Sequence, residues 1–227
     1  MLSSKKFRQS SKKVVSYIVP ANCVRLKCEG ANNTFTFNNE GSAGTISVFS
    51  GAPVVITATK KYGTSSFNNT SGYIKTASLA ECRFGTDDFT IEFWAYIFND
   101  SQSDLMVGRA EDGTDTWSLH VNGNWNLPDV GFWTAQAGYF IGSGQINKTT
   151  WTHLAYSRLN GVSYMHKNGI LQYSYSTSVI NIDKNASGVV TPTSSIRIGG
   201  NCYMDDIHIQ TGISKYTSAN FTPVALV

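Results

Sequence analysis

The chain has 227 residues, of which 41% are hydrophobic and 15% are charged, and its formal net charge is +3. The hydrophobic share is too high for a disordered protein, and no apolar run approaches the roughly 18 residues of a membrane-spanning helix. Charged residues fall below the roughly 25% of an average soluble domain, which together with many Ser, Thr, Asn and Gly residues favours sheets over helices. We expect one large all-β unit, because all-β folds of about 200–250 residues often form a single domain.

Positive charge is concentrated near the N-terminus, and no acidic residue occurs before Glu29. Five of the 18 Lys and Arg residues lie within the first 13 positions: Lys5, Lys6, Arg8, Lys12 and Lys13. Such a segment is either a flexible solubilising terminus or an arm that docks on an acidic surface. We therefore divide the chain into a basic N-terminal arm, residues 1–22, and one domain, residues 23–227.

The arm carries little further information. The apolar stretch Val14–Val19 is too short for the core of a signal peptide, so we expect no export signal. Phe7 is the only aromatic residue among the basic ones, so we expect no sequence-specific nucleic-acid binding.

Short alternating segments fill the domain and predict strands. Thr34–Phe37 and Thr45–Phe49 alternate in character, whereas Phe89–Phe98 (FTIEFWAYIF) is apolar on both faces and should be a central strand covered on both sides. Asn168-Gly169 predicts a two-residue hairpin, and no helical stripe occurs. Further strands are predicted over Asp104–Arg109, Trp117–Val121, Gly138–Ile141, Trp151–Arg158, Val162–Lys167, Gly169–Tyr175, Ser195–Ile198 and Tyr203–Gln210.

Four blocks of sequence carry a family resemblance. They are Lys60–Phe67 with Ser71–Ile74; Phe84–Trp94; Trp151–Arg158 with Met165–Gly169; and Ile196–Gly200 with Tyr203–Ile209, Lys215–Thr217 and Asn220–Pro223. In this order they resemble the concanavalin A-like, laminin-G-like jelly-roll domains, particularly those of bacteriophage tail and capsid-associated proteins. The resemblance implies a sandwich of two antiparallel sheets over about residues 25–223. It does not fix function, because lectins, glycosidases, adhesion modules and virion parts share this fold.

Tryptophan is the residue type that could bind sugar by stacking, although burial as a large core anchor is its commoner role. We expect Trp94 and Trp117 to be core neighbours, and Trp151 to share a face with His153. Trp125 and Trp133 lie in the Gly-, Asn- and Pro-rich stretch 122–136 and are the better candidates for carbohydrate binding.

Catalytic patterns are absent from the sequence. A glycosidase needs two carboxylates flanking a cleft, and the Glu-x-Asp-x-x-Glu motif of family members that hydrolyse β-glucans does not occur. Glu92 is followed only by Phe93 and Trp94, and the adjacent pairs Asp87-Asp88 and Asp205-Asp206 point to opposite faces if they lie on strands. The four His residues lack a recognisable nucleophile. We therefore assign no catalytic residue.

The resemblance also implies a structural calcium ion, since many laminin-G-like domains hold one. Asp205 or Asp206 could bind it with Glu29 or a nearby carbonyl, but Glu29 stands where relatives often have Asp, and we expect solvated or turn-capping carboxylates instead. We assign no resident metal or other cofactor. Four cysteines lack the spacing of a zinc site and are expected to be reduced, partly buried thiols: Cys23, Cys28, Cys82 and Cys202.

Three functions fit these observations. The leading one is a non-enzymatic phage virion structural protein, either a capsid decoration or a tail or fibre subunit. Its basic arm would reach another virion protein, and it would assemble in the host cytoplasm as a homo-oligomer such as a trimer. It could also contact host surface glycans. The alternative is a lectin-like carbohydrate-binding module that uses Trp125 and Trp133, and the third is a glycoside hydrolase.

Overall fold

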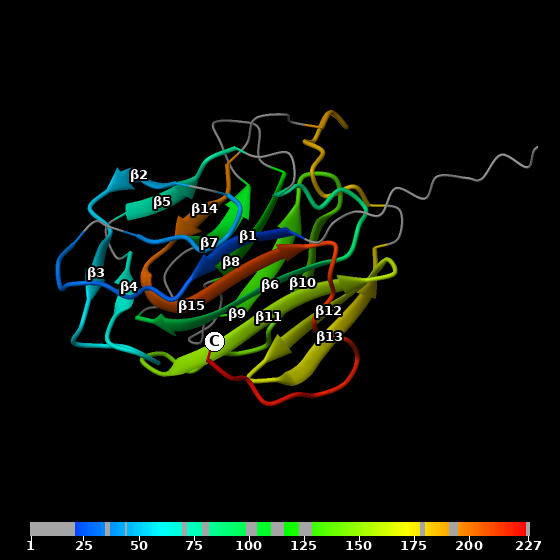
Figure 1. The fold of residues 1–227 in the computed structure, drawn as a ribbon. Coiled ribbons are helices and arrows are strands. Elements are labelled where there is room, and N and C mark those ends of the chain that lie inside the picture. The colour runs from blue at the N-terminus through cyan, green and yellow to red at the C-terminus, as the bar shows by residue number, and fades with distance from the viewer. Residues whose placement is uncertain are drawn as a thin grey trace, which may run out of the picture.

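The computed structural model describes residues 21–34, 37–43, 45–69, 72–78, 82–98, 104–109, 116–122, 129–177, 180–190 and 195–225. Over these residues the chain forms fifteen strands and no α-helix, and the strands build two antiparallel sheets that pack face to face (Figure 1). The described part therefore contains no helix that could cross a membrane. The predicted all-β sandwich is confirmed.

Sheet A has eight strands in the order β13-β12-β11-β6-β15-β4-β3, with β1 also pairing with β15. Their bounds are β1 (Ala21–Leu26), β3 (Val54–Ile56), β4 (Ser66–Asn68), β6 (Phe89–Ile97), β11 (Trp151–Leu159), β12 (Val162–Lys167), β13 (Ile170–Ser176) and β15 (Cys202–Thr211).

Sheet B has seven strands in the order β10-β9-β8-β7-β14-β5-β2. Their bounds are β2 (Ile46–Gly51), β5 (Gly72–Thr76), β7 (Asp104–Arg109), β8 (Trp117–Asn122), β9 (Asp129–Thr134), β10 (Gly138–Gly142) and β14 (Arg197–Gly199).

The core lies between the two sheets and is rich in aromatic rings. Trp117 of sheet B is fully buried with its ring 5.0 Å from that of Phe84, and Phe132 stacks on Tyr156 of sheet A at 3.9 Å. Burying each such side chain contributes about 1.5–3 kcal/mol. β6 lies between β11 and β15, and all its residues except Tyr96 are buried, which confirms the prediction of a central strand covered on both sides.

The hairpin between β12 and β13 turns at Asn168 and Gly169, as predicted. Both residues have positive φ, 50° and 76°, which a type I′ turn requires. Asn168 also ties the turn to β11, because its Oδ1 accepts a hydrogen bond from the amide of His153 at 2.9 Å.

After β15 the chain crosses the outer face of sheet A as a C-terminal strap, residues 212–223, drawn in red in Figure 1. Tyr216 and Phe221 of the strap stack on one another at 3.8 Å and cover His153 and His166. Several hydrogen bonds fix the strap to the sheet, among them those of Thr90 with Lys215, Ser157 with Tyr216, and Gly169 with Phe221. The strap therefore supplies the second cover of the central strands.

Two segments differ from the sequence analysis, and one prediction is wrong. Of the predicted strand Thr34–Phe37 the structure describes only the two end residues, and neither lies in a strand: Asn33 takes a φ of 59°, and Thr34 Oγ1 closes a turn by donating to the carbonyl of Ala31. Within the Gly-, Asn- and Pro-rich stretch 122–136, Val130 and Phe132 alternate into the core and make Asp129–Thr134 a strand that was not predicted. Trp94 and Trp117 are not neighbours: Trp117 faces the core, whereas Trp94 lies on the outer face of sheet A.

Candidate ligand-binding site

Three aromatic side chains lie side by side across the outer face of sheet A. Trp151 of β11 is in register with Tyr96 of β6, and Tyr96 is in register with Tyr203 of β15. Their adjacent ring centroids are 5.7 and 5.8 Å apart. Residues directly opposite one another on adjacent strands share a face, so the rings form one row, which we call the aromatic ladder (Trp151, Tyr96 and Tyr203).

All three rings of the aromatic ladder are half-buried. Ile97 and Met204, the chain neighbours of Tyr96 and Tyr203, point into the core, which directs the two tyrosines outward. Phe98 is also half-buried and packs edge-on against Tyr203 at 4.4 Å. Part-exposed aromatic rings gathered at one place on a sheet are a feature of binding surfaces.

The next row of the outer face is capped by the loop that carries Lys61 and Tyr62. Trp94 is 6% exposed; the ring of Tyr62 meets it edge-on at 5.6 Å, and Lys61 Nζ lies 4.0 Å above it. Asp205, opposite Trp94, holds this loop, since its Oδ2 accepts the amides of Lys61 and Tyr62 at 3.0 and 3.1 Å. The loop is thereby fixed beside the aromatic ladder.

Burial raises the pKa of Asp205 to about 7, and the neighbouring charge of Asp206 acts in the same direction. The hydrogen bonds from the amides of Lys61, Tyr62 and Asp206 oppose this shift because they stabilise the carboxylate.

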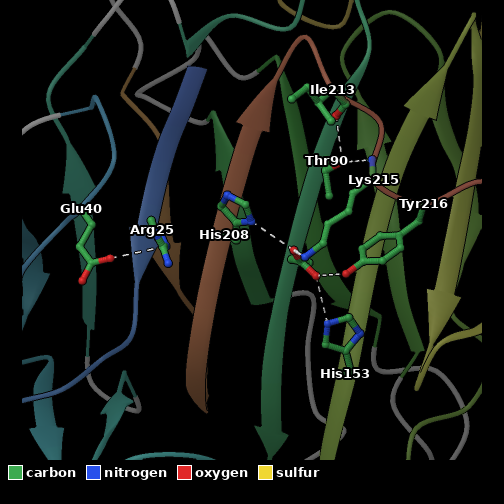
Figure 2. A network of polar contacts seen from close by, with 9 residues as sticks. Arg25, Glu40, Thr90, His153, His208, Ile213, Lys215 and Tyr216 are labelled. Atoms are coloured by element: carbon green, nitrogen blue, oxygen red, sulfur yellow. Dashed lines mark hydrogen bonds and ion pairs between the residues drawn. The ribbon is translucent and has the colours of Figure 1, made fainter. Parts of the chain in front are cut away.

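A buried carboxylate, Glu92 of β6, lies two residues before Trp94 and joins the sheet to the C-terminal strap. Figure 2 labels the four side chains that contact it, His153, His208, Lys215 and Tyr216. Its Oε1 accepts a hydrogen bond from Lys215 Nζ at 2.6 Å and lies 3.1 Å from His208 Nδ1. Its Oε2 lies 3.4 Å from His153 Nε2 and accepts a hydrogen bond from the hydroxyl of Tyr216. Four groups from β11, β15 and the strap therefore converge on one side chain.

Burial alone would raise the pKa of Glu92, but the hydrogen bonds from His153 and His208 and the charge of Lys215 outweigh it and hold the pKa well below its usual range. Burial and the negative charge of Glu92 raise the pKa of Tyr216. Glu92 is therefore ionised at neutral pH, and Tyr216 donates a hydrogen bond to it.

These two carboxylates do not make an accessible acid and base pair. A general acid or base must reach an oxygen of the substrate. Both oxygens of Glu92 are engaged by protein donors beneath the strap, and Asp205 is fully buried with both oxygens bonded to main-chain amides. The arrangement anchors two segments of chain and presents neither group to a ligand.

Two of the three carboxylates suggested for calcium, Glu29 and Asp205, are engaged by main-chain amides. Both oxygens of Glu29 accept the amide of Thr64 at 3.0 Å, and those of Asp205 accept the amides already described. Amide N–H groups carry partial positive charge and lie where a cation would have to bind. Among the described residues, no group of three or more His, Cys, Asp and Glu side chains could hold a metal. Both carboxylates instead cap turns.

Of the sequence-predicted sugar-binding residues, the structure describes Trp133 alone. Trp133 is half-buried in β9, opposite Ser118, and its chain neighbour Phe132 points into the core. It therefore lies on the outer face of sheet B, away from the aromatic ladder. Trp125 and the basic residues of the arm, Lys5, Lys6, Arg8, Lys12 and Lys13, lie outside the described residues.

All four cysteines are buried and none forms a disulfide, as the spacing predicted. Cys23 contacts Cys82, whose hydrogen bond raises the pKa of the Cys23 thiol, as does burial. Burial likewise raises the pKa of Cys28. These thiols are core residues rather than reactive ones.

Comparison with models of known protein families shows which superfamily the chain belongs to. The model of the concanavalin A-like lectin/glucanases superfamily matches residues 68–209, more than half of the chain. The chain belongs to this superfamily. The membership agrees with the predicted jelly roll, and no curated protein sequence matches the chain.

Solved structures show the superfamily fold at low sequence identity. The binding domain of Paraclostridial Mosquitocidal Protein 1 has a TM-score of 0.63 at 13% identity, covering 86% of this chain and 50% of that one. Domain 4 of AbnA, a GH43 extracellular arabinanase from Geobacillus stearothermophilus solved with arabinotriose, has a TM-score of 0.60 at 14% identity, covering 87% and 96%. The binding domain of botulinum neurotoxin DC, solved with rat synaptotagmin II, has a TM-score of 0.58 at 12% identity, covering 86% and 49%. The chain thus spans about half of the toxin binding domains and nearly all of the arabinanase domain.

Sequence reasoning missed the aromatic ladder. It placed Trp151 on the same face as His153, which the structure confirms, but took every outward residue of the Phe89–Phe98 segment to be covered. The available signal was the run Trp94, Tyr96 and Phe98, in which every second residue is aromatic. Its partners in register lie more than 50 residues away, so the sequence alone does not show that the rings meet.

Proposed function

We propose that this member of the concanavalin A-like lectin/glucanase superfamily binds carbohydrate without hydrolysing it, through the aromatic ladder. The observation that carries the proposal is the row of three half-buried rings, Trp151, Tyr96 and Tyr203, in register on three adjacent strands. Aromatic rings offer large, rigid apolar faces, and their polar edges hydrogen-bond at the same time. A sugar presents the complementary combination of C–H faces and hydroxyl edges.

The structural neighbours support a binding role. Two are named as binding domains, and the third is domain 4 of an arabinanase, which was solved in complex with arabinotriose. All three structures are less than 15% identical to this chain, so the similarity supports the shared fold. One of them shows that a domain of this fold can bind a sugar, but no binding residue is transferred from it to this chain.

The test is a glycan-binding titration with ladder variants. We expect Trp151→Ala and Tyr203→Ala each to weaken binding of a neutral oligosaccharide about tenfold, or about 1.4 kcal/mol, because each removes one stacking surface. Tyr173→Ala is the matched control, since Tyr173 is 48% exposed on β13 of the same sheet and lies outside the ladder. Isothermal titration calorimetry across a glycan panel measures the effect. Wild-type affinity in both ladder variants, or an equal loss in Tyr173→Ala, would contradict the proposal.

The non-catalytic part of the proposal rests on the engagement of Glu92 and Asp205 by protein donors. Incubation of the wild-type protein with each glycan that it binds should release no reducing ends. Release that is abolished in Glu92→Gln would replace the binding role by a hydrolytic one.

For the setting of this activity we propose a homo-oligomeric subunit of a phage particle, assembled in the host cytoplasm and attached to another virion protein by the basic arm. The five basic residues at positions 5–13 and the phage-type closing segments Lys215–Thr217 and Asn220–Pro223 support it. Quantitative mass spectrometry of purified particles should find the chain in a simple ratio to the major capsid protein or, for a tail part, in tens of copies. Deletion of residues 1–20 should abolish incorporation, and absence of the chain from particles would refute this setting.

A further inference from the structure

A second row of side chains crosses the outer face of sheet B. In register across five adjacent strands stand Trp133 of β9, Ser118 of β8, Gly108 of β7, Arg197 of β14 and Lys75 of β5. Ile198 and Ile74, the chain neighbours of the two cations, point into the core, so Arg197 and Lys75 face outward with Trp133. The aromatic residue and the two cations are all half-buried. The predicted sugar-stacking residue therefore shares one line of the sheet with two positive charges.

The pairing of two cations on adjacent strands is electrostatically unfavourable in a sheet. Arg197 and Lys75 are directly opposite one another, and like charges at such positions repel. Both are placed against one ring: the Arg197 guanidinium carbon lies 4.0 Å and Lys75 Nζ 5.0 Å from the centre of Phe49. Phe49 takes this position because β2 changes register between Val48 and Ser50. The bulge thus supplies a platform on which two positive groups stay together.

The residues between the ring and the cations are small. Ser118 and Gly108 are the only members of the row between Trp133 and Arg197, so no large side chain of this row separates them. Adjacent strands lie about 4.8 Å apart, which places Trp133 about 14 Å from Arg197 along the row. A ligand that reached from the ring to the cations would span several sugar units.

We propose that the outer face of sheet B binds an anionic oligosaccharide, with one sugar ring stacked on Trp133 and an acidic group further along the chain bound by Arg197 and Lys75. The Arg197 guanidinium carbon lies 4.0 Å from the centre of the Phe49 ring, and the planar N–H fork of a guanidinium can form a bidentate pair with a carboxylate or sulfate. The site is independent of the aromatic ladder, which lies on the other sheet. Its residues come from five adjacent strands of sheet B and from the β2 bulge.

The test is calorimetric titration of the full-length protein with three probes of similar length: oligogalacturonate, a heparin oligosaccharide and a neutral oligosaccharide that binds the ladder. We expect Arg197→Gln and Lys75→Gln each to weaken binding of the anionic probe at least tenfold and to leave neutral binding within twofold. Trp133→Ala should weaken anionic binding to a similar degree. Preference for galacturonate or for heparin identifies carboxylate or sulfate as the recognised group.

Matched variants separate this site from general charge attraction and from unfolding. Lys60→Gln removes the same charge from an exposed side chain outside the row and should change anionic binding less than twofold. Arg197→Lys keeps the charge but loses the fork, and should weaken binding while keeping the melting temperature of the wild type. Tyr203→Ala should leave anionic binding unchanged. Anionic binding that is absent in the wild type, unchanged in Arg197→Gln, or equally reduced in Lys60→Gln would overturn the inference.

Discussion

At the scale of single residues, Glu92 shows how far chemistry can depend on distant parts of a chain. In the sequence it stands between apolar and aromatic residues and suggests no function. In the structure it receives His153 from β11, His208 from β15, and Lys215 and Tyr216 from the strap. These donors lie 61 to 124 residues away, and no spacing rule connects them to Glu92. The position of Glu92 on a buried strand could be predicted, whereas its partners could not.

This network makes Glu92 important for stability. We expect Glu92→Gln to lower the free energy of unfolding by about 3 kcal/mol at pH 7, because the change removes one partner of a buried ionic cluster. The folded pKa of Glu92 is lowered, so its stabilisation is present above the unfolded pKa of about 4.5 and is lost as the pH falls through the folded value. The gap between wild type and variant should therefore narrow below about pH 4.5 in urea denaturation curves.

Glu40→Gln is the control for that measurement. Glu40 is a 47% exposed carboxylate that lies 3.5 Å from Arg25, in the same field of view in Figure 2. An exposed pair of this kind contributes at most about 1 kcal/mol. Losses of equal size in the two variants would show that the Glu92 cluster has no special role.

At the scale of elements, most strands and the β12–β13 hairpin could be predicted from alternation and turn residues, because both signals are local. The described ends of the predicted strand Thr34–Phe37 lie outside any strand, because the turn before them depends on Asn33, which accepts positive φ. The strand that carries Trp133 was not predicted, because Gly and Pro residues nearby hid a strand with only two apolar core-facing residues. The strap could not be predicted, since its course over sheet A is set by contacts with distant strands.

Gly169 is where hairpin and strap meet. A Cβ added to Gly169 would lie 1.8 Å from the carbonyl oxygen of Phe221, and its φ of 76° is strained for any other residue. We expect Gly169→Ala to displace the strap and to lower the free energy of unfolding by about 2–3 kcal/mol, of which roughly 1–2 kcal/mol is backbone strain. Faster hydrogen exchange at the amide of Phe221 would report the displacement.

Gly138→Ala separates the two causes. Gly138 has a similar φ of 70°, but a Cβ there would meet nothing within 4 Å. It should therefore show the strain alone and leave the exchange of Phe221 unchanged. If Gly169→Ala and Gly138→Ala lowered the free energy of unfolding equally, the clash with the strap would make no contribution to the loss in Gly169→Ala.

At the scale of the whole molecule, the two sheets turn different surfaces outward. Sheet A presents uncharged rings beside the strap, whereas sheet B presents one ring and two cations in line. The sandwich itself followed from the sequence, because its alternating segments and family blocks extend over nearly the whole domain. The sequence did not predict which residues lie opposite one another on neighbouring strands, because the register depends on pairing between strands that are far apart in the chain.

The two faces should act independently. We expect the double variant Tyr203→Ala with Arg197→Gln to lose neutral and anionic binding by the same factors as the two single variants, with a coupling energy below about 0.5 kcal/mol, because the residues lie on opposite sheets. A calorimetric double-mutant cycle measures this. Strong coupling would indicate one ligand that wraps around the edge of the sandwich, or a shift of the whole fold.

The pairing of β1 with β15 has a consequence for orientation. Ala21, the first described residue, lies opposite Thr211, whereas Tyr203 of the aromatic ladder lies near the other end of the same strand. Eight residues of strand separate these points by about 25 Å. If the domain is attached to a larger assembly through the residues before Ala21, it is held at one end of sheet A. The aromatic ladder then lies at the opposite end, facing away from the point of attachment.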